Sequence, residues 1–212
     1  MDVNAAGLEK KDLITEIIRR EWNMFTNVNN EGGRAGCQDD RLTFEVMRRS
    51  QFEAWNVPSL ESYLGDLDGA IAAGRNLVTE KYGHMMKSTA PLQYAAIADR
   101  LPMPTPEAAA LADEISALLL RQTEAYARQY PVMALQGRPL YAAEDGDGVT
   151  SVETYQKGEL YTYSAQTLER LLAWIREKEA EGKNFALMIL ENTVARYGFA
   201  SVAEAERAVG GQ

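Results

Sequence analysis

The chain has 212 residues, of which 46% are hydrophobic and 25% are charged, and this composition excludes fibrous and wholly disordered proteins. The formal net charge is −9, which argues against broad binding to nucleic acids or anionic membranes, because both require a positive field. A single cysteine and a single histidine exclude an intramolecular disulfide, an all-cysteine metal site and a multi-histidine zinc site. We therefore expect no metal centre, and we expect no cofactor.

The first residues carry charges where a signal peptide would have an apolar core. No window approaches about 18 uninterrupted apolar residues, the length that a membrane-spanning helix needs. These two features predict a cytoplasmic protein that does not cross a membrane, with residues 1–11 as a flexible N-terminus.

In the N-terminal quarter, apolar residues at helical spacing predict a first helix over residues 12–26, capped by Asp12. The run of Asn, Gly and Asp residues over 27–39 predicts an ordered loop. A second helix is expected over about 40–56 and should end before Pro58, since the residue before a proline avoids the helical region.

The middle of the chain contains two further helical segments. The first begins with Ser59 as its cap and extends to Met86, with glycines that favour a break near Gly65–Asp68. The second is capped by Thr105, has a proline at its first position and ends before Pro131.

The C-terminal part begins with a loop and then a long helix. Thr150 and Glu153 fit a capping box, which predicts a helix that continues to about Glu181. Two shorter helices are expected over about 184–197 and 201–209. The whole pattern predicts an all-α fold, in which residues 1–212 form a single domain of six to eight helices.

Polar residues on apolar helix faces indicate where chemistry can occur. Glu21 lies within the apolar stripe of the first helix, Arg48 and Gln51 share the inward face of the second, and Glu159 lies in the middle of an apolar face. A buried charge must be paired or line a wet cavity. Two interpretations remain open: a polar pocket inside the bundle, or a buried Arg–Glu pair that only fixes helix register.

The loop Gly32–Asp40 leads directly into the second helix, whose first N–H groups favour negative charge. Its glycines allow the backbone to approach a ligand, so we expect Cys37 and Gln38 to contact a substrate. Cys37 is either a nucleophile with a lowered pKa or an inert cysteine packed in a turn. The loop matches neither the P-loop nor the dinucleotide-binding pattern.

The segment Thr150–Ser164 concentrates tyrosines and hydroxyl groups around Glu159. Tyr155, Glu159 and Tyr163 are spaced by four, which places them along one line of a helix. A carboxylate beside phenols is suited to acid–base catalysis, so these three are the candidate catalytic residues and Ser151 is a candidate substrate contact. The alternative is a helix cap followed by an aromatic core seam.

These patterns give one geometric expectation. Because helices of one domain bury their apolar faces against a common core, the polar residues on those faces should gather where they can supply hydrogen bonds to one another. The residues expected to line one internal cavity, with the Gly32–Gln38 loop at its mouth, are Glu21, Arg48, Gln51, Tyr155, Glu159 and Tyr163.

Four blocks carry a resemblance to known proteins: GGRAGCQDD, MRRSQFEAW (Met47–Trp55), EKYGHMM (Glu80–Met86) and TSVETYQKGELYTYS. They resemble a bacterial family described as a domain of unknown function, over about two-thirds of the chain. The chain also looks like the arginine-containing cyclodipeptide synthases, which join amino acids delivered on charged tRNA. That likeness implies a metal-independent aminoacyl transferase in which Glu159 or Glu21 accepts a guanidinium.

The second likeness implies charged tRNA as a partner, bound by a local basic patch because the overall charge is negative. The evident candidates for that patch are Arg19, Arg20, Arg48, Arg49 and Lys157. We expect an enzyme that binds an amino-acid-like substrate in a buried polar pocket, with formation of an arginine-containing cyclodipeptide as the specific reaction. The alternative is a non-catalytic helical module that binds a small cationic metabolite or a partner helix.

Overall fold

Helices dominate the computed structural model, which describes residues 3–29, 33–146 and 148–211. The N-terminal half contains α1 (Val3–Thr26), η1 (Gly36–Asp39), α2 (Arg41–Ala54), α3 (Val57–Ala72), α4 (Leu77–Thr89) and α5 (Pro91–Ala95). The C-terminal half contains α6 (Pro106–Gln129), α7 (Pro131–Leu135), η2 (Ala142–Glu144), α8 (Val152–Leu160), α9 (Ala165–Ala180), α10 (Phe185–Arg196) and α11 (Val202–Gly210). The all-α class is confirmed, since no strand occurs within these ranges, but the eleven α-helices exceed the six to eight predicted.

The predicted segment 59–86 is two helices, and the break lies later than expected. α3 continues through the glycines near Gly65–Asp68 and ends at Ala72. Gly74 then adopts a φ of +68°, which suits glycine. Asn76 caps α4 by accepting a hydrogen bond from the Thr79 N–H. The Asn side chain and the left-handed glycine therefore outweigh the helical periodicity that runs across them.

The predicted long helix after residue 150 is also two helices. α8 ends at Leu160, and Ser164 caps α9 by accepting from the Thr167 N–H. The cap of α8 is Ser151 rather than Thr150, and Glu153 accepts from the Ala142 N–H instead of closing a capping box. The resulting turn between α8 and α9 carries Tyr163 back toward α8.

The remaining differences come from prolines and from the first cap. Pro91 and Pro131 each open a five-residue helix, because proline is well suited to the first helical position. Pro58 likewise lies in the first turn of α3, whose cap is Asn56 rather than Ser59. α1 begins at Val3, so Asp12 lies inside it and does not cap it. Thr105 caps α6 as predicted.

The core is assembled from the inner faces of α1, α2, α3, α6, α9 and the start of α10. Its largest fully buried side chains include Ile17, Phe52, Leu60, Ile115 and Leu168, each at most 1% exposed. A smaller apolar cluster of Val194, Val202 and Ala205 joins α10 to α11 and is covered by residues near α7. The helices that form the core thus bury one stripe of side chains each, whereas α5 and α7 contain no buried residue.

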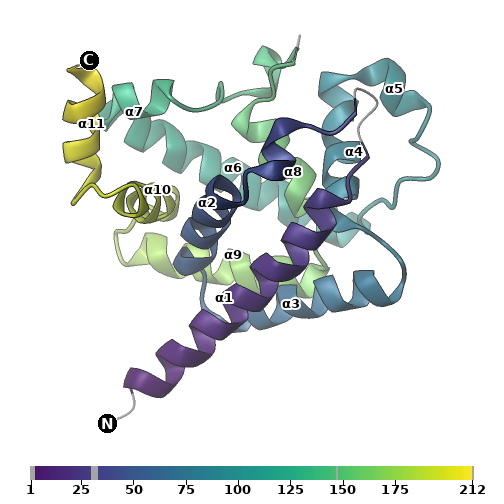
Figure 1. Cartoon of the computed structure of the whole chain (residues 1–212), viewed down its shortest axis with the longest axis horizontal. Coiled ribbons are helices and arrows are strands. Elements are labelled where there is room, and N and C mark those ends of the chain that lie inside the picture. The colour runs from purple at the N-terminus through teal and green to yellow at the C-terminus, as the bar shows by residue number, and fades with distance from the viewer. Residues whose placement is uncertain (1–2, 30–32, 147, 212) are drawn as a thin grey trace.

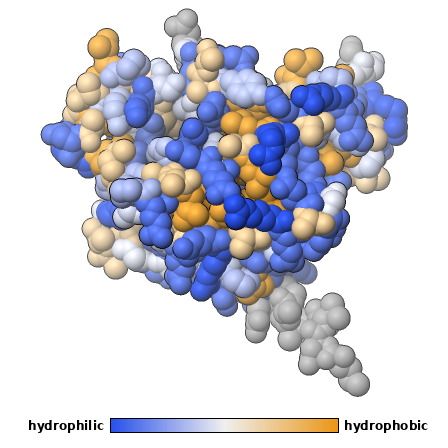
Figure 2. Space-filling view, turned by 180° about the vertical axis from the view of Figure 1, so that it is seen from behind, coloured by the Kyte–Doolittle hydropathy of each residue, from blue (hydrophilic) through white to orange (hydrophobic). Residues whose placement is uncertain are grey.

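Two groups of packed helices position the site (Figure 1). α1 crosses the front of the molecule and packs against α2 and α3, while α4 packs along α8. The opposite face is mostly hydrophilic, with hydrophobic side chains exposed near its centre (Figure 2). Within the described ranges, no helix is both long and apolar enough to cross a membrane.

Candidate functional site

A cavity of about 590 Å³ lies where α1, α2, α4 and α8 converge, with α10 at one side. Its walls are largely aromatic and aliphatic. The apolar side chains that line it include Phe25, Phe44, Met47, Val78, Val152 and Ile189. Its floor is formed by charged residues, four of which are linked by hydrogen bonds and are described next.

Arg48 is the centre of this charged floor. Its Nε and Nη2 atoms donate to the two carboxylate oxygens of Glu21 at 2.7 and 2.5 Å, the bidentate geometry that a guanidinium and a carboxylate favour. Its Nη1 donates to both oxygens of Glu159 at 3.0 and 3.1 Å, and to Gln51 Oε1 at 2.8 Å. Arg48 therefore joins α1, α2 and α8 in one contact.

Glu159 is the most heavily hydrogen-bonded carboxylate of the floor. Besides Arg48, its donors are the Lys81 ammonium at 2.6 Å, the Tyr163 hydroxyl at 2.6 Å and the Gln51 amide at 2.9 Å. On the other side, the Tyr63 hydroxyl donates to Glu21 at 2.7 Å. Two carboxylates and two cations thus form a buried network without net charge. We call Glu21, Arg48, Lys81 and Glu159 the charged quartet.

The surroundings of Glu159, Lys81 and Tyr163 fix the protonation of these three groups. Burial by itself would raise the pKa of Glu159, but the charges of Arg48 and Lys81 outweigh it and hold the pKa well below its ordinary value. Burial would likewise lower the pKa of Lys81, yet the Glu159 carboxylate raises it. Burial and the Glu159 charge together raise the pKa of Tyr163 well above its ordinary value. Near neutral pH these three groups are therefore carboxylate, ammonium and phenol.

A glycine allows α8 to approach α4 closely enough for this arrangement. A Cβ atom on Gly158 would lie 2.7 Å from Met85 Cγ and 2.9 Å from the Lys81 carbonyl oxygen, which are closer than real contacts. The absence of a side chain lets the two backbones meet beside the quartet. Glu159 is thereby brought within hydrogen-bonding distance of Lys81.

A second group of polar residues extends from the floor of the cavity to its mouth. The Lys81 ammonium lies 3.5 Å from the centroid of the Tyr155 ring, and the Arg138 guanidinium lies 4.7 Å from the same centroid. Both distances are in the range of cation–π contacts. Arg138, Asp40 and Cys37 are exposed and line the cavity. The mouth therefore carries both signs of charge, and its cation Arg138 lies over an aromatic ring.

The structure brings together most of the residues singled out in the sequence. Glu21, Arg48, Gln51, Glu159 and Tyr163 form one hydrogen-bonded network. Of the six residues expected to line the cavity, Glu21, Arg48, Tyr155 and Glu159 do so, whereas Gln51 and Tyr163 are not part of its lining. The pocket and the buried Arg–Glu pair, stated above as alternatives, coexist because the pair forms the floor of the pocket. The catalytic and binding roles of these residues stay predictions.

The expectation of a single helical line through Tyr155, Glu159 and Tyr163 is wrong. α8 ends at Leu160, so Tyr163 belongs to the turn that follows it, and the fold of that turn returns its hydroxyl to Glu159. Glu159 is also poorly suited to act as a general base, because each of its carboxylate oxygens already accepts at least two hydrogen bonds.

Two predicted contacts have other roles in the structure. Gln38 lies beneath the end of α1, where its amide nitrogen donates to the carbonyl oxygens of Phe25 and Val28. Ser151 is buried as the cap of α8. Cys37 does border the cavity, on η1, at its mouth. Gly32, the first residue of the Gly32–Asp40 loop, lies outside the described residues, as do residues 30 and 31.

Helical spacing did not single out Lys81, Tyr63 or Arg138. Lys81 follows the buried Leu77 by four residues and precedes the buried Met85 by four, so it lies on the inward face of α4, the same signal that identified Arg48. Tyr63 is indistinguishable by spacing from an ordinary core aromatic. Arg138 lies in a loop, where helical periodicity carries no information.

The basic residues expected to bind tRNA are mostly neutralised. Arg48 is buried in the quartet. Arg19 and Arg20 pair with Glu16, and Arg20 also pairs with Asp68. Lys157 lies between Asp113 and Glu153. Four of the five candidates therefore contribute little uncompensated positive charge.

The comparison with known families agrees with the first resemblance. A family model described as "Protein of unknown function (DUF4125)" matches residues 11–207. The chain belongs to this family. No curated protein and no solved structure matches it, and the family match gives no support to the likeness to cyclodipeptide synthases. Membership names no activity, so the function must be inferred from the cavity.

The described residues also give no indication of a metal centre. Within residues 3–29, 33–146 and 148–211, no group of three or more His, Cys, Asp or Glu side chains is arranged to hold an ion. The carboxylates of the quartet are hydrogen-bonded to cations of the protein itself.

Proposed function

We propose that this protein binds a small amphipathic molecule of amino-acid-like size in the cavity between α1, α2, α4 and α8. The observation that supports this is the contrast between apolar walls and a charged floor in one cavity of about 590 Å³. Pockets for small molecules combine such walls with a few convergent polar groups, in volumes of roughly 300–1,000 Å³. The apolar body of the ligand packs against the walls, and its polar end faces the quartet.

Binding is favoured over acid–base catalysis by the protonation states of the floor. A general acid or base works best with a pKa near the operating pH, whereas the pKa of Glu159 is far below and that of Tyr163 far above that range. The quartet is suited to holding and polarising a ligand.

Calorimetric titration of the full-length chain with a panel of amino acids and their derivatives tests this function. Val78 is half-buried and lines the cavity, so Val78→Trp should fill it and abolish the binding of any hit. Ile71→Trp provides the matched control, since Ile71 is exposed on α3, outside the cavity. Equal binding by both variants would place the ligand elsewhere and contradict the proposal.

Aminoacyl-tRNA-dependent formation of an arginine-containing cyclodipeptide stays a prediction about what happens to a bound amino acid. It is tested by expressing the chain in bacteria and profiling the medium by mass spectrometry. Cyclic dipeptides that contain arginine should accumulate with the wild type and disappear with Glu159→Gln. A medium without them, from cells that contain abundant folded protein, would count against this reaction and leave the binding function intact.

The alternative of a module for a cationic metabolite has less support. The carboxylates that would receive a cation already bind Arg48 and Lys81. The protein's own arginine occupies the place expected for a guanidinium substrate.

A further inference from the structure

The hydrogen-bonding capacity of the cavity floor is unevenly used. A carboxylate offers about four lone-pair positions. Glu159 receives five contacts, two from Arg48 and one each from Lys81, Gln51 and Tyr163. Glu21 receives three and is 3% exposed. The floor has therefore almost no acceptor left for an ammonium or guanidinium group of a ligand.

Donors, in contrast, remain at the cavity. The Lys81 ammonium has three N–H groups, and its one hydrogen bond in the described chain goes to Glu159. The guanidinium of Arg138 donates to the Thr150 carbonyl oxygen at 3.1 Å and otherwise lies at the exposed mouth. Both cations line the cavity and both lie over the ring of Tyr155.

From this imbalance we infer that the polar end of the ligand is a carboxylate, held between Lys81 and Arg138 beside the ring of Tyr155. The inference rests on the proposed function and specifies its ligand class. Lys81 is the buried donor and Arg138 the donor at the mouth. A carboxylate completes the hydrogen bonding of both cations, and charge-assisted bonds of this kind are about twice as strong as neutral ones.

Among the described residues that line the cavity, Asp40 is the one carboxylate outside the quartet. It caps α2 by accepting from the Thr43 N–H, and that hydrogen bond lowers the pKa of Asp40. Its exposed position at the mouth leaves room for the ammonium of an α-amino acid. Free amino acids therefore belong to the same ligand class, with the carboxylate as the group that is required.

The test uses compounds that share a skeleton and differ only at the polar end. The first series is 3-phenylpropanoate, 3-phenylpropanamide and 3-phenylpropylamine, and the second is hexanoate, hexanamide and hexylamine. Calorimetry on the full-length chain should show the acid of at least one series binding at least tenfold more tightly than its amide and its amine. Binding of an amine as tightly as its acid would overturn the inference and leave the proposed function standing. Absence of binding by all six would overturn both.

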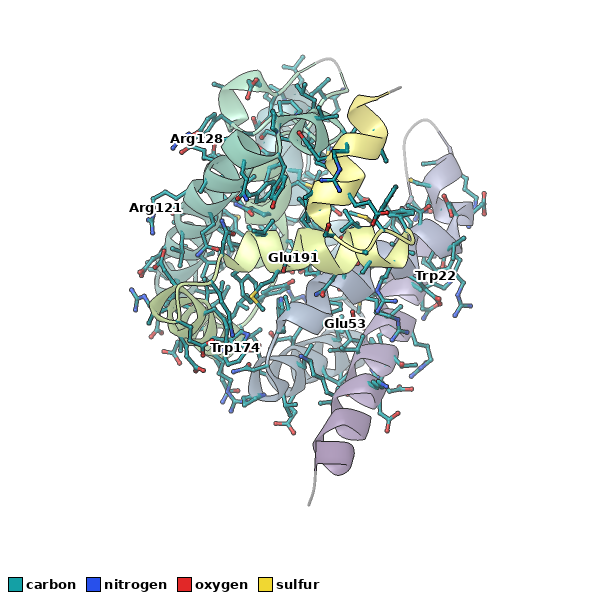
Figure 3. The ribbon with its side chains drawn as sticks, turned by 90° about the vertical axis from the view of Figure 1, so that its left-hand side faces the viewer. Trp22, Glu53, Arg121, Arg128, Trp174 and Glu191 are labelled. Carbon is teal, nitrogen blue, oxygen red and sulfur yellow. The ribbon has the colours of Figure 1, made fainter. Side chains whose placement is uncertain are left out.

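Variants then locate the carboxylate. Arg138→Gln removes an exposed cation and should weaken binding of the acid by about threefold to fivefold, with no change for the amide. Arg128→Gln is the matched control, because it changes the net charge equally at the end of α6, where Arg128 points outward from the molecule (Figure 3). An equal loss of affinity for the acid in the two variants would show that Arg138 does not bind the carboxylate of the ligand.

Lys81 needs a conservative variant, since loss of its charge would leave the quartet unbalanced. Lys81→Arg keeps the charge and the pairing with Glu159 but changes the shape of the donor. We expect it to fold and to bind the acid at least threefold less tightly, while the affinity for the amide stays within twofold. An unchanged preference of this variant for the acid would exclude Lys81 as the buried donor.

Discussion

The buried charged quartet and the exposed ion pairs of α6 use the same residue types in opposite surroundings. In the quartet, the side chains of Arg48, Lys81 and Glu159 are each 9% exposed. On α6, Arg121 pairs with Glu179 at 3.4 Å, and the two side chains are 64% and 48% exposed. Arg121 and Arg128 project from α6 into solvent (Figure 3). Water screens the second kind of pair, whereas each charge of the first depends on its protein partners.

The largest difference between the two regions should follow from removing an arginine. Arg48→Ala leaves Glu21 and Glu159 without their shared guanidinium and should lower the free energy of unfolding by about 3–5 kcal/mol. Arg121→Ala, the surface counterpart, should cost less than about 1 kcal/mol. Urea denaturation followed by circular dichroism measures both. Similar losses in the free energy of unfolding for the two variants would show that water solvates the unpaired carboxylates of the quartet as well as it solvates those at the surface.

A smaller effect should follow from removing one hydroxyl. Tyr163→Phe keeps the packing of the ring against Tyr63, at 4.6 Å between centroids, but loses the hydrogen bond to Glu159. Hydrogen bonds to charged groups contribute about 1.5–3 kcal/mol, which is the expected loss. Tyr161→Phe is the matched control: its hydroxyl donates to Asp113 at the surface, at 3.1 Å, and its loss should change stability by less than about 0.5 kcal/mol. The same denaturation experiment ranks the two, and a larger loss for Tyr161→Phe would contradict the comparison.

The smallest effect is a dependence of stability on acid pH. The pKa of Glu159 is lower in the folded protein than in the unfolded chain, where it is about 4.3. Below that value the unfolded chain binds a proton that the folded protein does not, so stability falls as the pH drops. The contribution of this carboxyl at pH 4 relative to pH 7 is about 0.6 kcal/mol. Glu159→Gln should lose that part of the pH dependence, and an unchanged profile in this variant would contradict it.

Helical periodicity predicted the fold class and the core of the site because burial of one helix face is a local property of the sequence. Glu21, Arg48 and Glu159 interrupt apolar stripes, and the structure joins them. Helix ends were harder to predict, since they depend on single caps: Asn76 and Ser164 end what looks like continuous periodicity. A cap of this kind competes with the stripe by about 1 kcal/mol, and spacing alone cannot show which wins.

Helical periodicity could not predict which charged side chains from distant parts of the sequence form ion pairs. Lys81 carries the same inward-face signal as Arg48, but the identity of its partner depends on how α4 and α8 pack together. That packing depends on Gly158. From the sequence alone, this glycine indicates only a residue of low helix propensity. The two carboxylates expected to accept a substrate guanidinium accept that of Arg48, because α2 brings Arg48 to both of them; the identity of the substrate stays a prediction.

The sequence separations within the quartet also set the order in which its ion pairs can form while the chain is being synthesised. Arg48 can meet Glu21 as soon as α2 has emerged, since they are 27 residues apart, but Lys81 must wait for Glu159, 78 residues later. At about 5–20 residues per second, that wait lasts about 4–16 seconds. During it the surface of α4 that packs against α8 has no partner, and water takes the place of Glu159 around the Lys81 ammonium. The nascent N-terminal half therefore exposes an unfinished apolar surface that the later helices cover.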